Sequence, residues 1–388
     1  MIEDRNIICI ASNWFYDPTS KHHIMKRLAE RNHIVWVNYH ASRRPQVSTA
    51  DFRAAAGKLR QIIEGPRRVS ENITVVTPLV LPLPGSAAAT NLNRRLLVRQ
   101  IRSVLRGLPS RPVQLWSFAP DVDALCGRFD EERMIYYCVD AFDEFSGYDS
   151  EAIRAAEARL AARADLVVTT SQVLFEAKRS LNENTILVPH GVDYTHFARA
   201  TAPDTHMPDD MVNLPRPIFG FWGLIQDWID LDWIAKISAA RPDGSVVLIG
   251  EAATDLSALT DLPNVHLLGR RPYATLPAYA RSFDVGLIPF RVNALTRAVN
   301  PIKLREYLAA GLPVISTPLP EVRRYRAFVQ IVEEGDSPEA ACQKAVEDGT
   351  PTAIAARQAA MKTESWSAKV EELSERITEC PSNKQRSR

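Results

Sequence analysis

The chain has 388 residues, of which 46% are hydrophobic and 24% charged, so it is long enough for two domains with ordinary buried cores. Its net charge of +1 excludes an overall basic or acidic protein, and no apolar run approaches the roughly 18 residues of a membrane span. The N-terminus MIEDRNIICIAS has acids before a short apolar run, which is not the pattern of a signal peptide.

The number and spacing of the cysteines bear on metal sites, disulfides and the cellular compartment. The five cysteines are scattered, without a CxxC pair or a His/Cys ligand spacing, so the sequence predicts no metal site and no disulfide framework. We therefore expect a protein of the reducing cytoplasm, soluble or attached to a membrane surface. The residues are Cys9, Cys126, Cys138, Cys342 and Cys380.

The first half alternates short apolar runs with amphipathic segments. Continuous apolar strands between helices indicate a parallel sheet with both faces covered. The expected strands are 6–12, 33–39, 73–78, 113–118, 134–140 and 165–171, and the expected helices are 22–32, 91–107, 121–129 and 150–164.

The second half repeats this plan, after a segment at 201–217 with four prolines that is typical of a stiff linker. We predict an α/β protein with a first domain at 1–200, a linker at 201–216, a second domain at 217–360, a C-terminal helix within 361–380 and a disordered tail at 381–388. The expected strands are 217–223, 245–251, 265–269, 284–290, 313–317 and 328–333, and the expected helices are 230–240, 275–282, one from 301 to 311, 337–347 and 352–377.

Charge is unevenly distributed along the chain. Residues 21–111 contain 17 Lys/Arg but only 4 Asp/Glu. Such an excess fits an anionic partner, namely a membrane surface, a phosphorylated lipid or a nucleic acid, although a solvated basic face is an equal alternative. The sequence has no Walker A, GxGxxG or GxSxG motif, which disfavours a nucleotide triphosphatase, a standard dinucleotide enzyme and an α/β-hydrolase.

The stretch NPIKLREYLAAGLPVIST (300–317) is the strongest candidate for a ligand site. Asn300 is expected to cap a helix, yet Lys303 stands in its first turn, where a cation opposes the helix dipole. An anion at this N-terminus would make Lys303 its counter-charge, and Glu306 would then accept hydrogen bonds from a ribose diol. The alternative is an exposed lysine beside an ordinary helix glutamate.

Other candidates follow strand ends, where ligands bind in such sheets. Asp140 is the first polar residue after an apolar strand and is a candidate general base. The segment SNWFYDPTSKHH (12–23) offers groups for a phosphate or an acceptor, some of which are expected to be plain surface residues. These groups are Ser12, Asn13, Lys21 and His22.

Three further turns carry candidates with a structural alternative. His190 lies in the HGVD turn at the crossover between the halves, and Gly223 gives a tight turn after the strand that ends in FWG. Arg271 and Tyr273 follow a strand in GRRPY, where they would meet a diphosphate or a nucleobase, or simply water.

Taken together, these segments resemble retaining glycosyltransferases of the GT-B fold, especially the family-four-like enzymes of polysaccharide assembly. The resemblance spans most of the chain and is carried by DLVVTTS (165–171), VPHGVDYTHF (188–197), FWG (221–223), LIGE (248–251), LLGRRPY (267–273) and NPIKLREYLAAGLPVIST. It implies two Rossmann-like domains that face a central cleft, and a C-terminal helix, preceded by Trp366, that crosses back to the first domain.

The resemblance also implies an activity: metal-independent transfer of a sugar from a nucleotide-sugar, with UDP or GDP as the expected nucleotide and no cofactor. Lys303 would hold the diphosphate, Glu306 the ribose, and the backbone near Arg271 and Tyr273 the base. Gly223 and Asn300 would complete the donor site. Expected acceptors are a saccharide or a polyprenyl-diphosphate-linked lipid at the inner face of the cell membrane, reached through the basic 21–111 region, and no nucleic acid is expected.

Two departures from the family pattern affect this expectation. Ala298 stands where the family has a first glutamate that contacts the donor sugar, and Leu224 stands where a basic residue commonly follows the glycine of FWG. Retention is the favoured outcome, with inversion by Asp140 as base the alternative. The rival functions are a nucleotide-sugar epimerase or hydrolase and a non-catalytic nucleotide-sugar-binding partner of an assembly complex.

Overall fold

The structure is a computed structural model that describes residues 1–39, 65–78 and 87–380. The chain divides into two compact units. The first comprises Met1–Pro189 together with the residues from Val370 onward, and the second comprises His190–Lys369. The predicted disordered tail at 381–388 lies outside the described residues.

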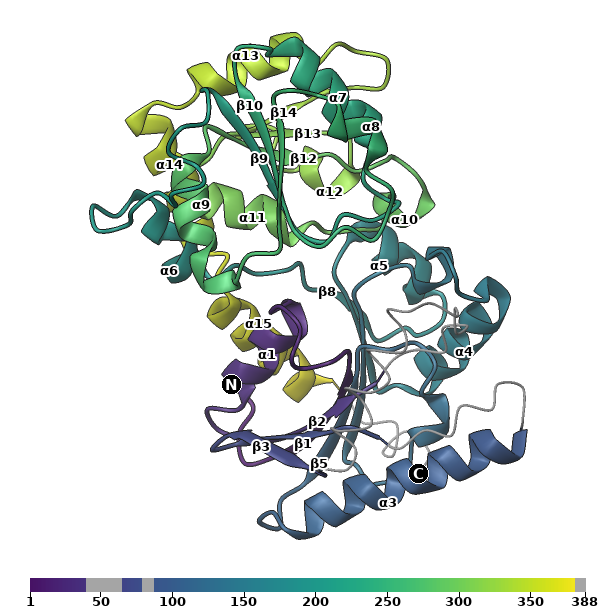
Figure 1. Cartoon of the computed structure of the whole chain (residues 1–388). Coiled ribbons are helices and arrows are strands. Elements are labelled where there is room, and N and C mark those ends of the chain that lie inside the picture. The colour runs from purple at the N-terminus through teal and green to yellow at the C-terminus, as the bar shows by residue number, and fades with distance from the viewer. Residues whose placement is uncertain (40–64, 79–86, 381–388) are drawn as a thin grey trace. The chain divides into compact units, whose positions relative to one another are not determined.

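The first unit is built on an eight-stranded sheet with the strand order β3-β4-β2-β1-β5-β6-β7-β8 (Figure 1). All neighbours pair in parallel except β3 and β4. Its strands are β1 (Asn6–Ala11), β2 (His33–Asn38), β3 (Arg67–Ser70), β4 (Ile73–Val76), β5 (Val113–Ser117), β6 (Arg133–Cys138), β7 (Leu166–Thr169) and β8 (Thr185–Leu187). Its helices are α1 (Ser20–Leu28), α3 (Ala87–Arg106), α4 (Ser150–Arg163) and α5 (Gln172–Arg179).

The second unit is built on six parallel strands in the order β11-β10-β9-β12-β13-β14 (Figure 1). The strands are β9 (Ile218–Trp222), β10 (Ser245–Ile249), β11 (Val265–Gly269), β12 (Val285–Ile288), β13 (Val314–Ser316) and β14 (Val329–Ile331). The helices are α6 (Tyr194–Phe197), α7 (Leu231–Ala240), α8 (Ser257–Thr260), α9 (Leu276–Ser282), α10 (Ala294–Arg297), α11 (Ile302–Ala309), α12 (Pro320–Arg323), α13 (Glu339–Glu347) and α14 (Pro351–Lys362). The predicted α/β class with two doubly wound sheets is confirmed.

Both sheets reverse their strand order at one point, and this reversal locates the loops of interest. In the first sheet β1 lies between β2 and β5, and in the second β9 lies between β10 and β12. In open parallel sheets, ligands bind outside the carboxyl ends of the strands at such a reversal. The loops after β1 and β9 therefore occupy the favoured positions, and β6 ends at the same edge as β1.

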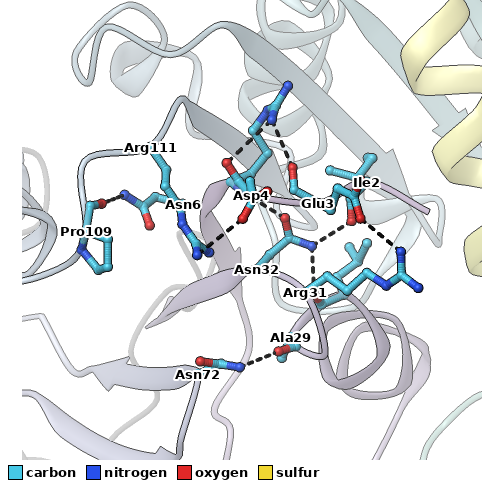
Figure 2. Close-up of polar contacts among 12 residues, drawn as sticks. Ile2, Glu3, Asp4, Asn6, Ala29, Arg31, Asn32, Asn72, Pro109 and Arg111 are labelled. Atoms are coloured by element: carbon cyan, nitrogen blue, oxygen red, sulfur yellow. Dashed lines mark hydrogen bonds and ion pairs between the residues drawn. The ribbon is translucent and has the colours of Figure 1, made fainter.

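The amino end of the first sheet is closed by polar contacts (Figure 2). Asn32 donates to the carbonyls of Ile2 and Leu28 at 2.9 and 2.7 Å, and Asn6 donates to that of Pro109 at 2.9 Å. Arg111 pairs with Asp4 at 3.2 Å. A shallow polar pocket lies at this edge, but its groups are engaged with one another, so we regard the contacts as structural.

Two predicted elements differ from those observed. The helix expected at 121–129 is only a single 3-10 turn, Asp123–Leu125, because the chain turns at Gly127, whose φ is +76°. The helix expected at 352–377 is two helices, α14 and α15 (Trp366–Glu379).

The proline-rich segment expected as a stiff linker packs on the second unit. Met211 is fully buried in the core of that unit, and Asp210 pairs with Arg271 at 2.9 Å. The units divide at Pro189 and His190, whereas the sequence placed the domain boundary at residue 200. The chain passes back to the first unit within α15, and Cys380 at its end donates to the Asp165 carbonyl. The central cleft stays a prediction.

Candidate functional site

Lys303 and Glu306 lie together at the switch point of the second sheet. Both belong to α11, which starts after the loop that follows β12. Glu306 is 8% exposed, and its Oε2 accepts a hydrogen bond of 2.8 Å from the Trp222 indole Nε1. Tyr307, next on the helix, accepts from the Trp222 backbone N–H at 3.2 Å. The last residue of β9 is thus tied twice to α11.

Gly223 leaves the space that the Lys303 side chain occupies. Its φ is +137°, a conformation that side chains rarely adopt, and a Cβ built there would lie 2.2 Å from Lys303 Cε and 2.6 Å from Nζ. The Lys303 ammonium also lies 5.6 Å from the centre of the Phe221 ring, within the range of a cation–π contact. The turn after β9 and the first turn of α11 therefore form one surface.

Burial changes the titration of both groups. It lowers the pKa of Lys303, while Glu306 acts in the opposite direction. Burial raises the pKa of Glu306, and the Trp222 hydrogen bond and Lys303 oppose that rise. A bound dianion would raise the pKa of Lys303 again, because a nearby opposite charge favours the ionised form of the lysine.

Asn300 does not cap α11, contrary to the sequence expectation. Pro301 occupies the N-cap position. The Asn300 side chain is buried, accepts from Arg305 Nη1 at 2.6 Å and donates to Glu321 Oε2 at 3.2 Å. Arg305, only 2% exposed, also pairs with Glu364 at 3.2 Å. These contacts fix the loop that leads into Lys303, and direct donor contact by Asn300 stays a prediction.

Arg271 is engaged by its own unit. Its guanidinium donates to the Tyr279 hydroxyl at 2.7 Å, to the Leu268 carbonyl at 2.5 Å and to Asp210 at 2.9 Å. A diphosphate would have to compete with these partners. The resemblance implies that the backbone near Arg271 and Tyr273 contacts the nucleobase, and this contact stays a prediction.

Tyr273 is held next to the HGVD turn. The His196 ring stacks on it with centroids 4.5 Å apart, and His196 Nε2 contacts its carbonyl oxygen at 3.1 Å. Burial raises the pKa of Tyr273, with a further contribution from Glu306. Glu306 of α11 thus contributes to the electrostatic environment of Tyr273.

The turn that contains His190 pairs with the segment before α15. Val192 donates to the Glu364 carbonyl at 2.9 Å, and Trp366 donates to that of Val192 at 3.2 Å. The buried His190 ring lies 5.8 Å from that of Trp366. Asp193 caps α6 by accepting from the His196 N–H at 3.2 Å. This geometry favours a structural role for His190.

In the first unit, Asp140 and Lys21 interact electrostatically at the carboxyl edge of the sheet. Burial raises the pKa of Asp140 and Lys21 lowers it. Burial lowers the pKa of Lys21, while Asp140 and Cys9 raise it. Among the residues that the structure describes, neither side chain has a hydrogen bond or ion pair, and their contact with a ligand stays a prediction.

His22 does not face this edge as an open ligand group. It is 3% exposed, its Nδ1 accepts from the Thr19 N–H at 3.1 Å, and its Nε2 therefore donates to the Trp14 carbonyl at 3.1 Å. Burial lowers the pKa of His22 to about 3, with Lys21 contributing in the same direction. A neutral, fully bonded imidazole holds the loop after β1 in place.

Ser12 and Asn13 are partly exposed parts of the same loop. The Ser12 carbonyl accepts from the Trp36 indole at 3.0 Å, and Asn13 Oδ1 accepts from the Phe15 N–H at 3.1 Å. The Asn13 oxygen shapes the turn, while the Ser12 hydroxyl makes no recorded contact in the described structure. Their contact with an acceptor stays a prediction.

The sequence interpretation missed Trp222. Its ring lies in the core, and its indole N–H is the hydrogen-bond donor to Glu306. The available signal was its place at the carboxyl end of β9, immediately before Gly223, because ligands bind beyond strand ends at a switch point.

Within the described ranges there is no group of three His, Cys, Asp or Glu side chains that could hold a metal ion. In the same ranges no helix has the length and apolar character needed to cross a membrane.

Comparison with known proteins identifies the class. The family model described as glycosyl transferases group 1 matches residues 216–356. Two solved structures match over nearly the whole chain. Sucrose-phosphate synthase from Thermosynechococcus elongatus has a TM-score of 0.68 and 15% identity, with coverage of 96% of this chain and 98% of that one. Anabaena HepE in complex with UDP-glucose has a TM-score of 0.66 and 14% identity, with coverage of 96% of this chain and 99% of that one. At these identities the likeness shows the fold, which is the GT-B fold, as predicted.

A curated relative supports the family directly. TuaH of Bacillus subtilis strain 168, a glycosyltransferase provisionally assigned to teichuronic acid biosynthesis, is 30% identical over 274 residues, which are 65% of this chain and 68% of that protein. The chain belongs to the group 1 glycosyltransferases, and the predicted enzyme class is confirmed.

Proposed function

We propose that the protein transfers a sugar from a nucleoside-diphosphate sugar to a saccharide or lipid-linked acceptor in polysaccharide biosynthesis. The observation that carries the proposal is the pairing of Lys303 with Glu306 on one face of α11, over the glycine turn after β9. A diphosphate would take the Lys303 ammonium and the free N–H groups of the helix start. The ribose diol would donate to Glu306.

In this proposal, the chemistry depends on stabilising the leaving group. The bond between the anomeric carbon and the diphosphate oxygen breaks, the acceptor oxygen forms the new bond to that carbon, and the nucleoside diphosphate leaves with the negative charge that grows on its oxygen. Lys303 neutralises this charge without a metal ion. The UDP-glucose bound to the similarly folded HepE supports a nucleotide-sugar donor, and the provisional role of TuaH supports a polysaccharide product.

The acceptor side is assigned to the first unit. Asp140 would orient the acceptor hydroxyl if the anomeric configuration is retained, which the family resemblance favours. If the configuration is inverted, Asp140 would take the hydroxyl proton as general base, and its raised pKa suits that role. The anomeric configuration of the product, read by proton NMR, separates the two.

Attachment to an anionic membrane through the basic region also belongs to the proposal. In the described part of α3, Arg95, Arg99, Arg102 and Arg106 recur at spacings of four, three and four, which places them along one exposed face of the helix. Binding to phosphatidylglycerol vesicles that weakens with added salt would support this attachment. Salt-independent binding would contradict it.

The donor site is tested by thermal shift with nucleoside diphosphates and nucleotide-sugars. Ligand binding to the native state raises the melting temperature by mass action. Lys303→Ala is expected to lose most of the shift, while Lys236→Ala, which removes an exposed lysine of α7, keeps it. Equal shifts in both variants would place the donor elsewhere.

A further inference from the structure

The loop after β1 displays two aromatic side chains to solvent. Phe15 is 38% exposed and Tyr16 is 58% exposed, and in the described part of the chain no other aromatic residue reaches such exposure. Exposed apolar groups that cluster are usually binding surfaces. We call residues 12–19 the aromatic loop.

The backbone of the aromatic loop and the Trp14 ring are held in place by internal contacts. Trp14 packs against His22 and Trp36 with ring centroids 5.3 and 4.9 Å apart. The Trp14 N–H donates to Asn38 Oδ1 at 2.9 Å, and the Tyr16 N–H donates to the Asn13 carbonyl at 3.2 Å. A surface that is ordered before binding loses less entropy when a ligand docks.

Cations surround the aromatic rings. The Arg67 guanidinium lies 5.2 Å from the Phe15 ring centre, and the Lys26 ammonium lies 5.7 Å from that of Trp14. Neither cation has an acidic partner within the described residues. Asp17 is the one acid of the loop, and the two cations lie beside the Phe15 and Trp14 rings.

We infer that the aromatic loop is a subsite for an acidic saccharide, the sugar chain of the acceptor. The axial C–H groups of a pyranose form an apolar face that packs on an aromatic ring, whose own face carries negative charge density. Arg67 and Lys26 would meet the carboxylate or phosphate groups of that chain. Asp140 stands at the same edge of the sheet, where the reacting hydroxyl would lie.

A lipid surface is the less suitable occupant. Insertion into a bilayer requires apolar groups that can leave water without taking charges with them. Here a guanidinium covers one face of Phe15, and the loop offers two exposed rings only. The inference rests on the proposed glycosyltransferase function, of which it specifies the acceptor class.

The test measures binding of hexuronic-acid oligosaccharides, and of neutral oligosaccharides of equal length, by titration calorimetry. Tyr16→Ala and Phe15→Ala are expected to weaken binding of both sugars about 3- to 10-fold, the value of an aromatic contact. Arg67→Gln should remove the preference for the acidic sugar. Leu181→Ala, an exposed apolar truncation in the same unit, should bind as the wild type does.

Three results would overturn the inference. The wild type could bind neither sugar, or the Phe15→Ala and Tyr16→Ala variants could bind both sugars as the wild type does. These variants could also lose binding to phosphatidylglycerol vesicles while their sugar binding is unchanged. The nucleoside-diphosphate thermal shift is measured on the same proteins. If that shift is absent while the rings still govern sugar binding, the donor proposal fails and the aromatic loop stands. If the shift persists and sugar binding ignores the rings, the reverse holds.

Discussion

Each unit places a lysine and a carboxylate at the carboxyl edge of its sheet, but the two pairs are built differently. Lys303 and Glu306 share one helix, and Glu306 is fixed by the Trp222 indole. Lys21 and Asp140 come from α1 and from the end of β6, and the described structure gives Asp140 no hydrogen-bonded partner for its carboxylate.

Under the proposed function, this difference would assign donor binding to the first of these pairs and contact with the acceptor hydroxyl to the second. A carboxylate whose oxygen is already hydrogen-bonded is suited to hold a ligand in one orientation. Burial raises the pKa of both carboxylates, so the contrast lies in the hydrogen bond: a carboxylate without such a bond within the described residues is suited to take a proton from a ligand. In the proposed function, the second unit would therefore bind the nucleoside diphosphate of the donor, and the first unit would meet the acceptor hydroxyl.

The largest effect is expected at Asp140. Asp140→Asn keeps the shape of the side chain but cannot accept a proton, so turnover should fall about 100-fold or more while the donor KM is unchanged. Steady-state kinetics with varied donor measure both values. A loss below tenfold would assign Asp140 to acceptor orientation and would weaken the contrast between the pairs.

A smaller effect is expected at Glu306. Glu306→Gln keeps an oxygen for the Trp222 indole but removes the charge that a ribose diol would meet. Donor binding should weaken about 10- to 100-fold, which is the contribution of a hydrogen bond to a charged group. Calorimetry with a nucleoside diphosphate and with its 2′,3′-dideoxy form, which lacks both hydroxyls of the diol, measures the change. The dideoxy ligand should bind both proteins alike, and a uniform loss for both ligands would argue against ribose contact.

His22 supplies the pH test of the first unit. Its pKa is lowered from 6.5 to about 3 by burial, so the unfolded chain binds the extra proton between these values and the folded chain does not. Stability from His22 is therefore complete above pH 6.5 and is lost as the pH falls. We expect a loss of about 2 kcal/mol between pH 6.5 and about 5.

Urea unfolding of the wild type and of His22→Gln at both pH values measures this loss. The variant cannot titrate at this position and should show a smaller pH dependence. Equal dependence in the two proteins would mean that His22 is accessible to protons, and the aromatic loop would then lack its rigid support.

The smallest effect is expected at Lys21. Its charge lowers the pKa of Asp140, so Lys21→Met should raise that pKa and move the acidic limb of the kcat/KM profile to higher pH. Lys236→Met, which removes an exposed lysine of α7 in the second unit, is the control and should leave the limb in place. A limb that moves to lower pH in Lys21→Met would show that Asp140 is not the group observed.

Local sequence was sufficient to predict the fold and to locate α11, the helix that carries Lys303 and Glu306. Alternation of apolar runs with amphipathic segments predicted the parallel strands and their order along the chain, because burial of a strand on both faces requires such runs. Lys303 was visible as a cation in a first turn, and Gly223 as a turn glycine after an apolar strand. These features depend on near neighbours in the chain.

Partners far apart in the chain were decided only by the tertiary structure. Asn300 reads as a helix cap, but Arg305 and Glu321 take its side chain. Arg271 reads as a diphosphate ligand, but Asp210 pairs with it across 61 residues. His22 reads as a contact for a phosphate or an acceptor, but two tryptophans enclose it. A sequence gives the polar groups and their periodicity, whereas burial decides which of them must be bonded to each other and which stay available to a ligand.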